Sequence, residues 1–158
     1  NQEVYLIGDS LMASLSFDLK NKLVAKNYQF NTSMFSGCLF FPFFEAEPCN
    51  RHYLNNIYDI ISEKKGSIII FGGRFPLHLN QELFDNTEGG LENYKPIPKY
   101  WSNGKYATIE ESFEKEVLSL SENNKVIHST GSTSIITLES ADSASSIANS
   151  GVSATVII

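Results

Sequence analysis

The chain has 158 residues, of which 42% are hydrophobic, and its formal net charge is -6. This length suffices for one domain with a substantial core. The acidic balance argues against a nucleic-acid partner, which would need a basic face, and no apolar stretch approaches the roughly 20 residues of a membrane span. The chain starts just before a predicted strand, without an initiator Met or a signal-peptide pattern, so we expect a piece of a longer protein.

The amino-terminal part predicts two strands joined by a helix. Residues 4–7 are an apolar run of buried-strand type, and leucines recur at helical spacing over residues 10–26. Residues 28–35 are a weaker strand candidate that ends at Ser36-Gly37-Cys38. Residues 39–48 hold four phenylalanines and two prolines, so we expect an irregular packed loop there.

The middle of the chain predicts a second helix over residues 51–65 and a strand over residues 67–71. That strand is filled with β-branched and aromatic residues, which is typical of strands buried on both faces. It ends at Gly72-Gly73-Arg74. Residues 77–103 show little periodicity, and loops of this length are often lids or binding surfaces.

The next segment predicts a third helix and a fourth strand. Thr108 and Glu111 have the spacing of a capping box before an amphipathic run, and residues 125–128 have strand character. Strands that alternate with helices predict a parallel sheet with right-handed crossovers. We therefore expect an α/β domain of three layers, α/β/α, with a parallel sheet of four to five strands.

The carboxyl-terminal segment differs in composition. From Ser129 onward it is rich in Ser, Thr and Ala, and no Lys or Arg follows Lys125. The apolar runs 134–138 and 152–158 are candidate strands, and residues 140–150 are a weak helix or a linker. We therefore divide the chain into an α/β domain, residues 1–128, and an atypical Ser-rich segment, residues 129–158. The change marks a boundary, an unusual end or a reading-frame error.

Three strand ends carry residues suited to chemistry: Gly8-Asp9-Ser10, Ser36-Gly37 and Gly72-Gly73-Arg74. In a parallel sheet these ends share one edge, where ligands bind. Ser10 would stand at a helix amino terminus, whose N–H groups and dipole favour a developing oxyanion. Such a serine can be a nucleophile for acyl chemistry. The alternative is that Ser10 is only a helix N-cap and Gly8-Asp9 only a turn.

The two cysteines, Cys38 and Cys49, lie close together in the aromatic-rich loop. A disulfide between them would stabilise the fold by roughly 3 kcal/mol and would indicate an oxidising compartment such as the bacterial periplasm. The alternative is two free, buried thiols in a cytosolic protein. His52 is near Cys49, but no fourth ligand has a matching spacing, so we expect neither a metal site nor a cofactor.

The order of these motifs resembles the SGNH/GDSL hydrolase superfamily. More narrowly, Ser36-Gly37-Cys38 followed by Phe41-Pro42 and Cys49 is similar to the SGNH domains fused to family 3 membrane acyltransferases. The resemblance implies a flavodoxin-like fold and a periplasmic domain of an inner-membrane protein. It also implies O-acylation, for example O-acetylation, of surface glycans such as lipopolysaccharide or O-antigen, with the acyl donor delivered by an upstream transmembrane domain. With it we predict a Cys38–Cys49 disulfide.

The resemblance also assigns roles at the strand ends. Ser10 would be the catalytic nucleophile, and the backbone N–H groups of Ser10 and Gly37 would be two donors of the oxyanion hole. The hydrolases take a third donor from the asparagine of Gly-x-Asn, whereas Arg74 occupies that position here. A guanidinium can stabilise an oxyanion. Arg74 could also hold a carboxylate or phosphate of a glycan, or be a structural ion pair.

One part of the family pattern is missing. These families have Asp-x-x-His near the carboxyl terminus, with the histidine as general base, and this chain has no such motif. We expect His52 to be a loop or cap residue, His78 a solvated loop residue, and His128 a packed or edge residue. Without a base, Ser10 is a weak nucleophile near neutral pH.

The alternatives to an acyltransferase are therefore a carbohydrate esterase, a catalytically incomplete glycan-binding module, or a flavodoxin-like domain with an unrelated role. Several aromatic residues in or beside the long loop would suit stacking on sugar rings, although they are also ordinary core residues. They are Phe84, Tyr94, Tyr100, Trp101 and Tyr106.

Overall fold

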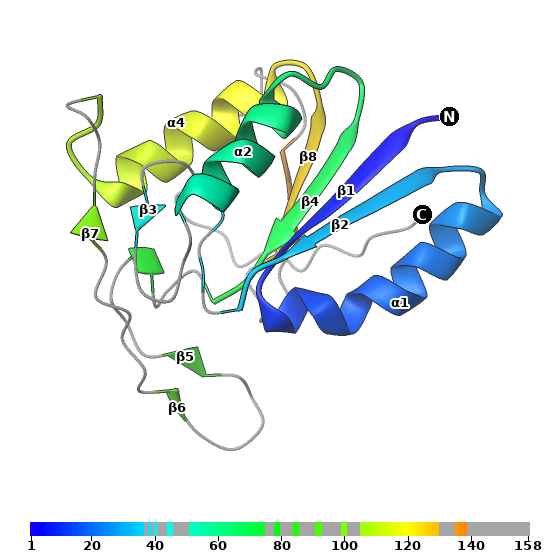
Figure 1. The fold of residues 1–158 in the computed structure, drawn as a ribbon, viewed down its shortest axis with the longest axis horizontal. Coiled ribbons are helices and arrows are strands. Elements are labelled where there is room, and N and C mark those ends of the chain that lie inside the picture. Colours follow the sequence, from blue (N-terminus) through cyan, green and yellow to red (C-terminus); the bar gives the residue numbers. More distant parts are fainter. Residues whose placement is uncertain are drawn as a thin grey trace.

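The computed structural model describes residues 1–36, 38, 40, 44–45, 51–74, 78–79, 84–85, 91–92, 99–100, 105–129 and 135–138. A sheet with the strand order β2-β1-β4-β8-β9 forms its centre (Figure 1). The strands are β1 (Glu3–Gly8), β2 (Gln29–Met34), β4 (Ile68–Gly72), β8 (Lys125–Ser129) and β9 (Ile135–Leu138).

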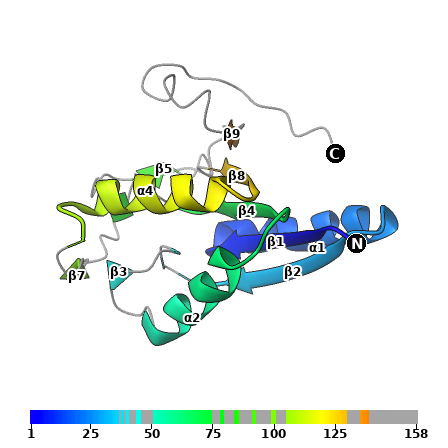
Figure 2. The same cartoon turned by 90° about the horizontal axis from the view of Figure 1, so that it is seen from above.

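The first four of these strands are parallel, as predicted. β9 pairs antiparallel with β8, at the opposite edge of the sheet from β2 (Figure 2). A short apolar run indicates a strand but not its direction, so the sequence did not reveal this orientation. Because β9 belongs to the Ser-rich segment, part of that segment joins the sheet, and the division at residue 129 stays a prediction. Residues 140–150 and 152–158 lie outside the described part of the chain.

Helices cover both faces of the sheet, which gives the predicted three-layer α/β/α fold. α1 (Ser10–Ala25) lies on one face, and α2 (Arg51–Ser62) and α4 (Ile109–Ser121) lie on the other (Figure 1). The predicted bounds of α1 and α2, residues 10–26 and 51–65, agree with the structure to within three residues. No helix among the described residues is long and apolar enough to cross a membrane.

The alternation of side chains along the strands builds the core. One face of the sheet packs with α2 and α4 into an apolar cluster that includes Ile7, Ile69 and Phe71 from the strands. The neighbouring residues Val4 and Leu6 are also completely buried, and they point to the other face, where α1 lies. Burial on both faces explains why β1 and β4 are almost continuously apolar.

Two short antiparallel pairs lie within the stretches predicted to be loops. β3 (Phe44–Glu45) pairs with β7 (Lys99–Tyr100), and β5 (Phe84–Asp85) pairs with β6 (Leu91–Glu92). The pairing of β3 with β7 places residues 44–45 next to residues 99–100.

The capping box that begins α4 is present. The Thr108 hydroxyl oxygen accepts a hydrogen bond from the Glu111 N–H at 3.1 Å. In return the Glu111 carboxylate accepts from the N–H of Ala107 at 2.9 Å, one residue before the cap. Both bonds satisfy N–H donors that have no partner within the helix.

Candidate functional site

The carboxyl ends of β1, β2 and β4 meet at one edge of the sheet, at the same level. Gly8, the last residue of β1, stands in register with Met34 of β2 and Gly72 of β4. The N–H of Phe35 donates to the carbonyl oxygen of Gly8 at 2.7 Å, which extends this register beyond the strands. The segments that follow the three strands therefore begin side by side, as expected for a ligand-binding edge.

Gly8 is required at this edge because the backbone is too close for a side chain. A Cβ at this position would collide with the carbonyl oxygen of Gly72 and with the side chain of Met12 in α1. The glycine thus allows β1, β4 and the first turn of α1 to approach one another.

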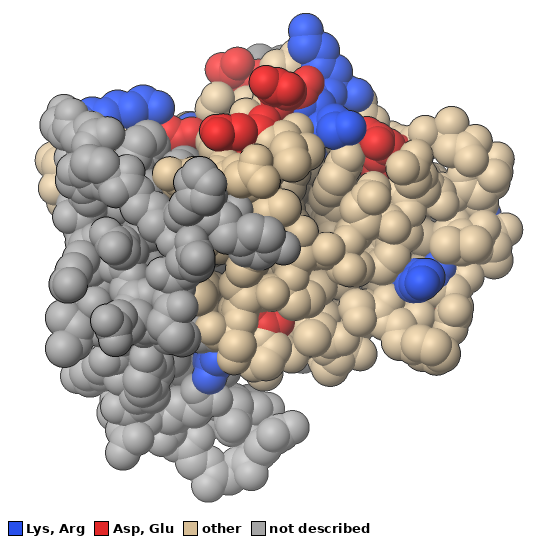
Figure 3. Space-filling model, viewed as in Figure 1, with Lys and Arg blue, Asp and Glu red and all other residues tan. Residues whose placement is uncertain are grey.

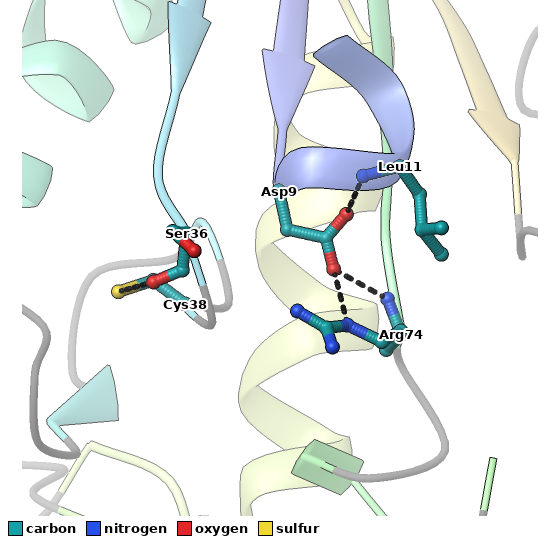
Figure 4. Close-up of polar contacts among 5 residues, drawn as sticks. All are labelled: Asp9, Leu11, Ser36, Cys38 and Arg74. Atoms are coloured by element: carbon teal, nitrogen blue, oxygen red, sulfur yellow. Dashed lines mark hydrogen bonds and ion pairs between the residues drawn. The ribbon is translucent and has the colours of Figure 1, made fainter. Parts of the chain in front are cut away.

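The carboxylate of Asp9 links α1 to the end of β4 (Figure 4). Its Oδ1 accepts from the N–H of Leu11 at 2.9 Å, and its Oδ2 accepts from the backbone N–H of Arg74 at 3.1 Å and from Arg74 Nε at 3.0 Å. The side chains of Asp9 and Arg74 are 1% and 17% exposed. Of the roles considered for Arg74, the ion pair is therefore present, and it is largely buried.

Gly73 shapes the backbone around this carboxylate. Its φ of +154° disfavours residues with a side chain, and a Cβ there would stand 3.2 Å from both Cγ and Oδ2 of Asp9. The glycine before Arg74 thus lets the carboxylate reach the two Arg74 donors.

Ser10 is the first residue of α1 and is exposed to solvent. Asp9, not Ser10, is the N-cap of this helix, so the alternative that assigned Ser10 a capping role is wrong. The first turn of a helix presents backbone N–H groups and the positive end of the helix dipole. Ser10 therefore carries an accessible hydroxyl in an environment that favours negative charge.

Ser36 and Cys38 come after β2, whose end stands next to the end of β1 that leads into Asp9 (Figure 4). Cys38 is buried, and its sulfur lies 3.4 Å from the carbonyl oxygen of Ser36. The structure describes no free cysteine thiol, but Cys49 lies outside the described residues, so the Cys38–Cys49 pairing stays a prediction. Gly37 also lies outside them, so its role as an oxyanion donor is untested.

His78 is not the solvated loop residue that we expected, because it is only 2% exposed. Burial lowers the pKa of His78 to about 4; the Asp9 carboxylate acts against this shift, and the Arg74 guanidinium adds to it. His78 is therefore neutral at pH 7, and it lies close enough to Asp9 and Arg74 for their charges to affect its pKa. Its position four residues after Arg74 placed it near this edge, but nothing in the sequence signalled its burial.

The other two histidines also occupy ordered elements. His128 is the penultimate residue of β8, in register with Phe71 of β4. His128 packs against Phe71 and Phe113, with ring centroids 5.1 and 5.6 Å apart, as expected for a packed residue. Burial lowers the pKa of His128 to about 4. His52 occupies the second position of α2, inside the helix and not in a loop or a cap.

A second buried carboxylate, Glu116 of α4, was not recognised in the sequence. It accepts hydrogen bonds from the hydroxyls of Tyr58 and Tyr106, and Lys105 Nζ lies 2.8 Å from its Oε1. Burial tends to raise the pKa of Glu116, but the bonds from Lys105 and the two tyrosines outweigh burial and lower it. The Tyr106 hydroxyl thus donates a hydrogen bond to Glu116. This contact gives Tyr106 a structural role and adds no support to the suggestion that it stacks on a sugar.

The described residues contain no cluster of three or more His, Cys, Asp or Glu side chains that could hold a metal ion. The chain matches no protein-family model, no curated protein and no solved structure. The resemblance to the SGNH/GDSL superfamily therefore stays a prediction that depends on the motifs at the strand ends.

Proposed function

We propose that this chain is the SGNH-type domain of a membrane-bound O-acyltransferase, which transfers an acyl group such as acetyl to a cell-surface glycan through Ser10. The observation that carries this proposal is the exposed Ser10 at the start of α1, directly after Asp9 of the largely buried Asp9–Arg74 pair. In this proposal the domain is extracytoplasmic, and an upstream transmembrane domain delivers the acyl donor.

The chemistry has two steps. The Ser10 Oγ attacks the carbonyl carbon of the acyl donor, its proton passes to a base, and the donor's leaving group departs, which leaves an acyl-serine ester. A glycan hydroxyl then attacks the carbonyl carbon of this ester and forms the glycan ester; the bond from the acyl group to Ser10 Oγ breaks, and the proton lost by the glycan hydroxyl passes through the base to Ser10 Oγ. Each step passes through an oxyanion, and losing one donor to such an oxyanion typically slows the reaction about 10²–10³-fold.

The surface around Ser10 suits a neutral acceptor. Residues 11–17, which follow Ser10 in α1, carry no charge, and the exposed charges of this helix, Asp18, Lys20 and Lys22, come after them. In the view of Figure 3, many of the charged side chains gather along the top edge of the molecule. Arg74, the cation at the strand edge, is already paired with Asp9. A sugar hydroxyl needs no opposite charge for recognition, in contrast to a phosphate.

The second candidate is a glycan-binding module without catalysis. It is favoured by the missing Asp-x-x-His motif and by the placement of the described histidines, since His78 is buried and His128 packs against two phenylalanines. A carbohydrate esterase, in which water resolves the acyl-serine, is a variant of the first candidate.

A fluorophosphonate probe, which reacts with activated serines, separates these candidates. We expect the purified chain to be labelled at Ser10, as mapped by peptide mass spectrometry, and Ser10→Ala to abolish the label. Ser14→Ala is the matched control, because Ser14 is an exposed serine on the same helix. A folded wild-type chain that takes no label would exclude the acyl-transfer hypothesis and leave glycan binding. If Ser10 is labelled, release of the acyl group from acylated Ser10 separates the two reactions. Faster release when a sugar is added indicates a transferase, and release to water alone indicates an esterase.

A further inference from the structure

We propose that Asp9 is a positioning residue, which holds the Arg74 guanidinium and the turn that carries Ser10 in a fixed relation, so that Arg74 donates to the oxyanion formed at Ser10. This inference rests on the proposed function. It assigns to the aspartate next to the nucleophile the orientation of an arginine.

The first argument is that one carboxylate bonds to both sides of the site. Oδ1 accepts from the Leu11 N–H, directly after Ser10, and Oδ2 accepts from two donors of Arg74. The positions of the nucleophile's turn and of the guanidinium are thus set by the same side chain (Figure 4).

The second argument is that Arg74 is held at two points. Its backbone N–H and its Nε both donate to Oδ2, at 3.1 and 3.0 Å. Because a guanidinium is planar and rigid, fixing Nε together with the backbone fixes the plane in which its two terminal nitrogens lie. Such preorganisation is what a donor to a developing oxyanion requires.

The third argument is that the residues around Asp9 protect its contact with Arg74 and leave space for it. The Asp9 side chain is 1% exposed, so water hardly competes with Arg74 for its oxygens. Gly73 has no side chain at the point where a Cβ would press on the carboxylate at 3.2 Å. A carboxylate needed only to cap α1 would not require this backbone, because one bond to Leu11 suffices for a cap.

The test separates capping from positioning by Asp9→Asn. Asn is as good an N-cap as Asp, but it removes the charge that holds the guanidinium. We expect α1 to remain folded by circular dichroism and the maximal rate of fluorophosphonate labelling at Ser10 to fall about 10²-fold. The probe concentration at half-maximal rate should change little, whereas a merely structural disturbance would alter both.

A second experiment tests whether added guanidinium can replace the missing arginine side chain. In Arg74→Ala, millimolar guanidinium chloride should restore part of the labelling rate, relative to sodium chloride at equal ionic strength, because Asp9 can bind the added cation. In the double variant Asp9→Asn/Arg74→Ala the same addition should restore nothing, and without guanidinium the double variant should be no slower than Arg74→Ala alone.

The outcomes are distinct. Wild-type labelling in folded Asp9→Asn, or equal rescue of the single and double variants, would overturn the role of Asp9 and leave the proposed function intact. If the wild-type chain takes no label at Ser10, the proposed function fails and this inference fails with it. Should Asp9→Asn not fold, Asp9→Glu replaces it, because Glu keeps the charge but displaces the carboxylate by one methylene; an unchanged rate in that variant would also overturn the proposal.

Discussion

Two buried carboxylates, Asp9 and Glu116, are held in similar ways in different regions of the molecule. Asp9 accepts two backbone N–H bonds and one guanidinium bond at the strand edge, and Glu116 accepts two tyrosine hydroxyls and a lysine between α2 and α4. Their side chains are 1% and 6% exposed. Burial and satisfied hydrogen bonds therefore do not by themselves indicate which of them belongs to a reactive site.

Position in the fold distinguishes them. Asp9 lies at the carboxyl ends of parallel strands, next to an exposed serine at a helix amino terminus, which is where open α/β sheets bind ligands. Glu116 lies in the helical layer and ties Lys105 and Tyr106, which follow the long loop, to Tyr58 of α2. We therefore interpret Asp9 as part of the site and Glu116 as a structural anchor.

Replacing Glu116 tests this distinction. Among the single substitutions considered for stability, it should lower the free energy of unfolding strongly. Glu116→Ala removes a buried bond from Tyr58 and a partly buried bond from Tyr106 to a charged acceptor, so we expect the free energy of unfolding measured in urea to fall by about 4 kcal/mol. Labelling of the folded protein at Ser10 should not change. Glu114→Ala, an exposed glutamate of the same helix, is the control and should stay within about 0.5 kcal/mol of wild type. A loss of labelling as large as that expected for Asp9→Asn would contradict the structural interpretation.

Acid should destabilise both regions through their histidines. The pKa values of His78, near Asp9, and His128, against α4, are about 4 in the folded chain, below the ordinary value of about 6.5. Between these values the unfolded chain binds more protons, so stability is complete above about pH 6.5 and falls as pH falls toward 4. Each histidine should contribute a loss of about 3 kcal/mol over this interval.

A single substitution divides this effect between the regions. His128→Phe keeps an aromatic ring against Phe71 and Phe113 but cannot take up a proton. Urea unfolding measured from pH 7 to pH 4 should then show a loss smaller than that of the wild type by about 3 kcal/mol, because only the contribution of His128 is removed. An unchanged loss in this variant would mean that His128 does not titrate as its burial indicates.

Crowding at the strand edge should cost somewhat less. Gly8→Ala would place a methyl group against the Gly72 carbonyl and Met12, and overpacking of this kind costs about 1–3 kcal/mol. Gly66→Ala is the matched control, because Gly66 has a φ of +70° but no atom within 4 Å of the point that a Cβ would occupy. It should lose only about 1 kcal/mol, from backbone strain. Equal losses in the two variants would show that the crowding at Gly8 costs no more than the backbone strain at Gly66.

Much of the fold could be predicted because its signals are local. The apolar runs of β1 and β4 and the helical spacing of leucines in α1 gave elements whose ends agree with the structure to within a residue or two. The strand ends could be placed on one edge because parallel strands share their direction. The antiparallel β9 lay beyond such reasoning, since direction depends on how the chain returns to the sheet.

The contacts of the candidate site depend on distant parts of the chain. Asp9 bonds to Arg74, 65 residues later, and Glu116 bonds to Tyr58, 58 residues earlier. A sequence shows that such side chains exist but not that their atoms meet in the fold. His78 was misjudged for the same reason, because its burial is set by what packs around it and not by its neighbours in sequence.

The smallest expected effect compares the two helix caps. Thr108 caps α4 with one bond to the Glu111 N–H, whereas the cap of α1, Asp9, also holds Arg74. Thr108→Ala should therefore cost about 1 kcal/mol of unfolding free energy, as is usual for a simple cap, and Thr108→Ser should restore most of it. Asp9→Ala should cost more, because it also removes the carboxylate that accepts from a largely buried guanidinium. If the two alanine variants lose the same free energy, the Asp9–Arg74 pair adds nothing to stability, and the carboxylate at the strand edge is a cap like any other.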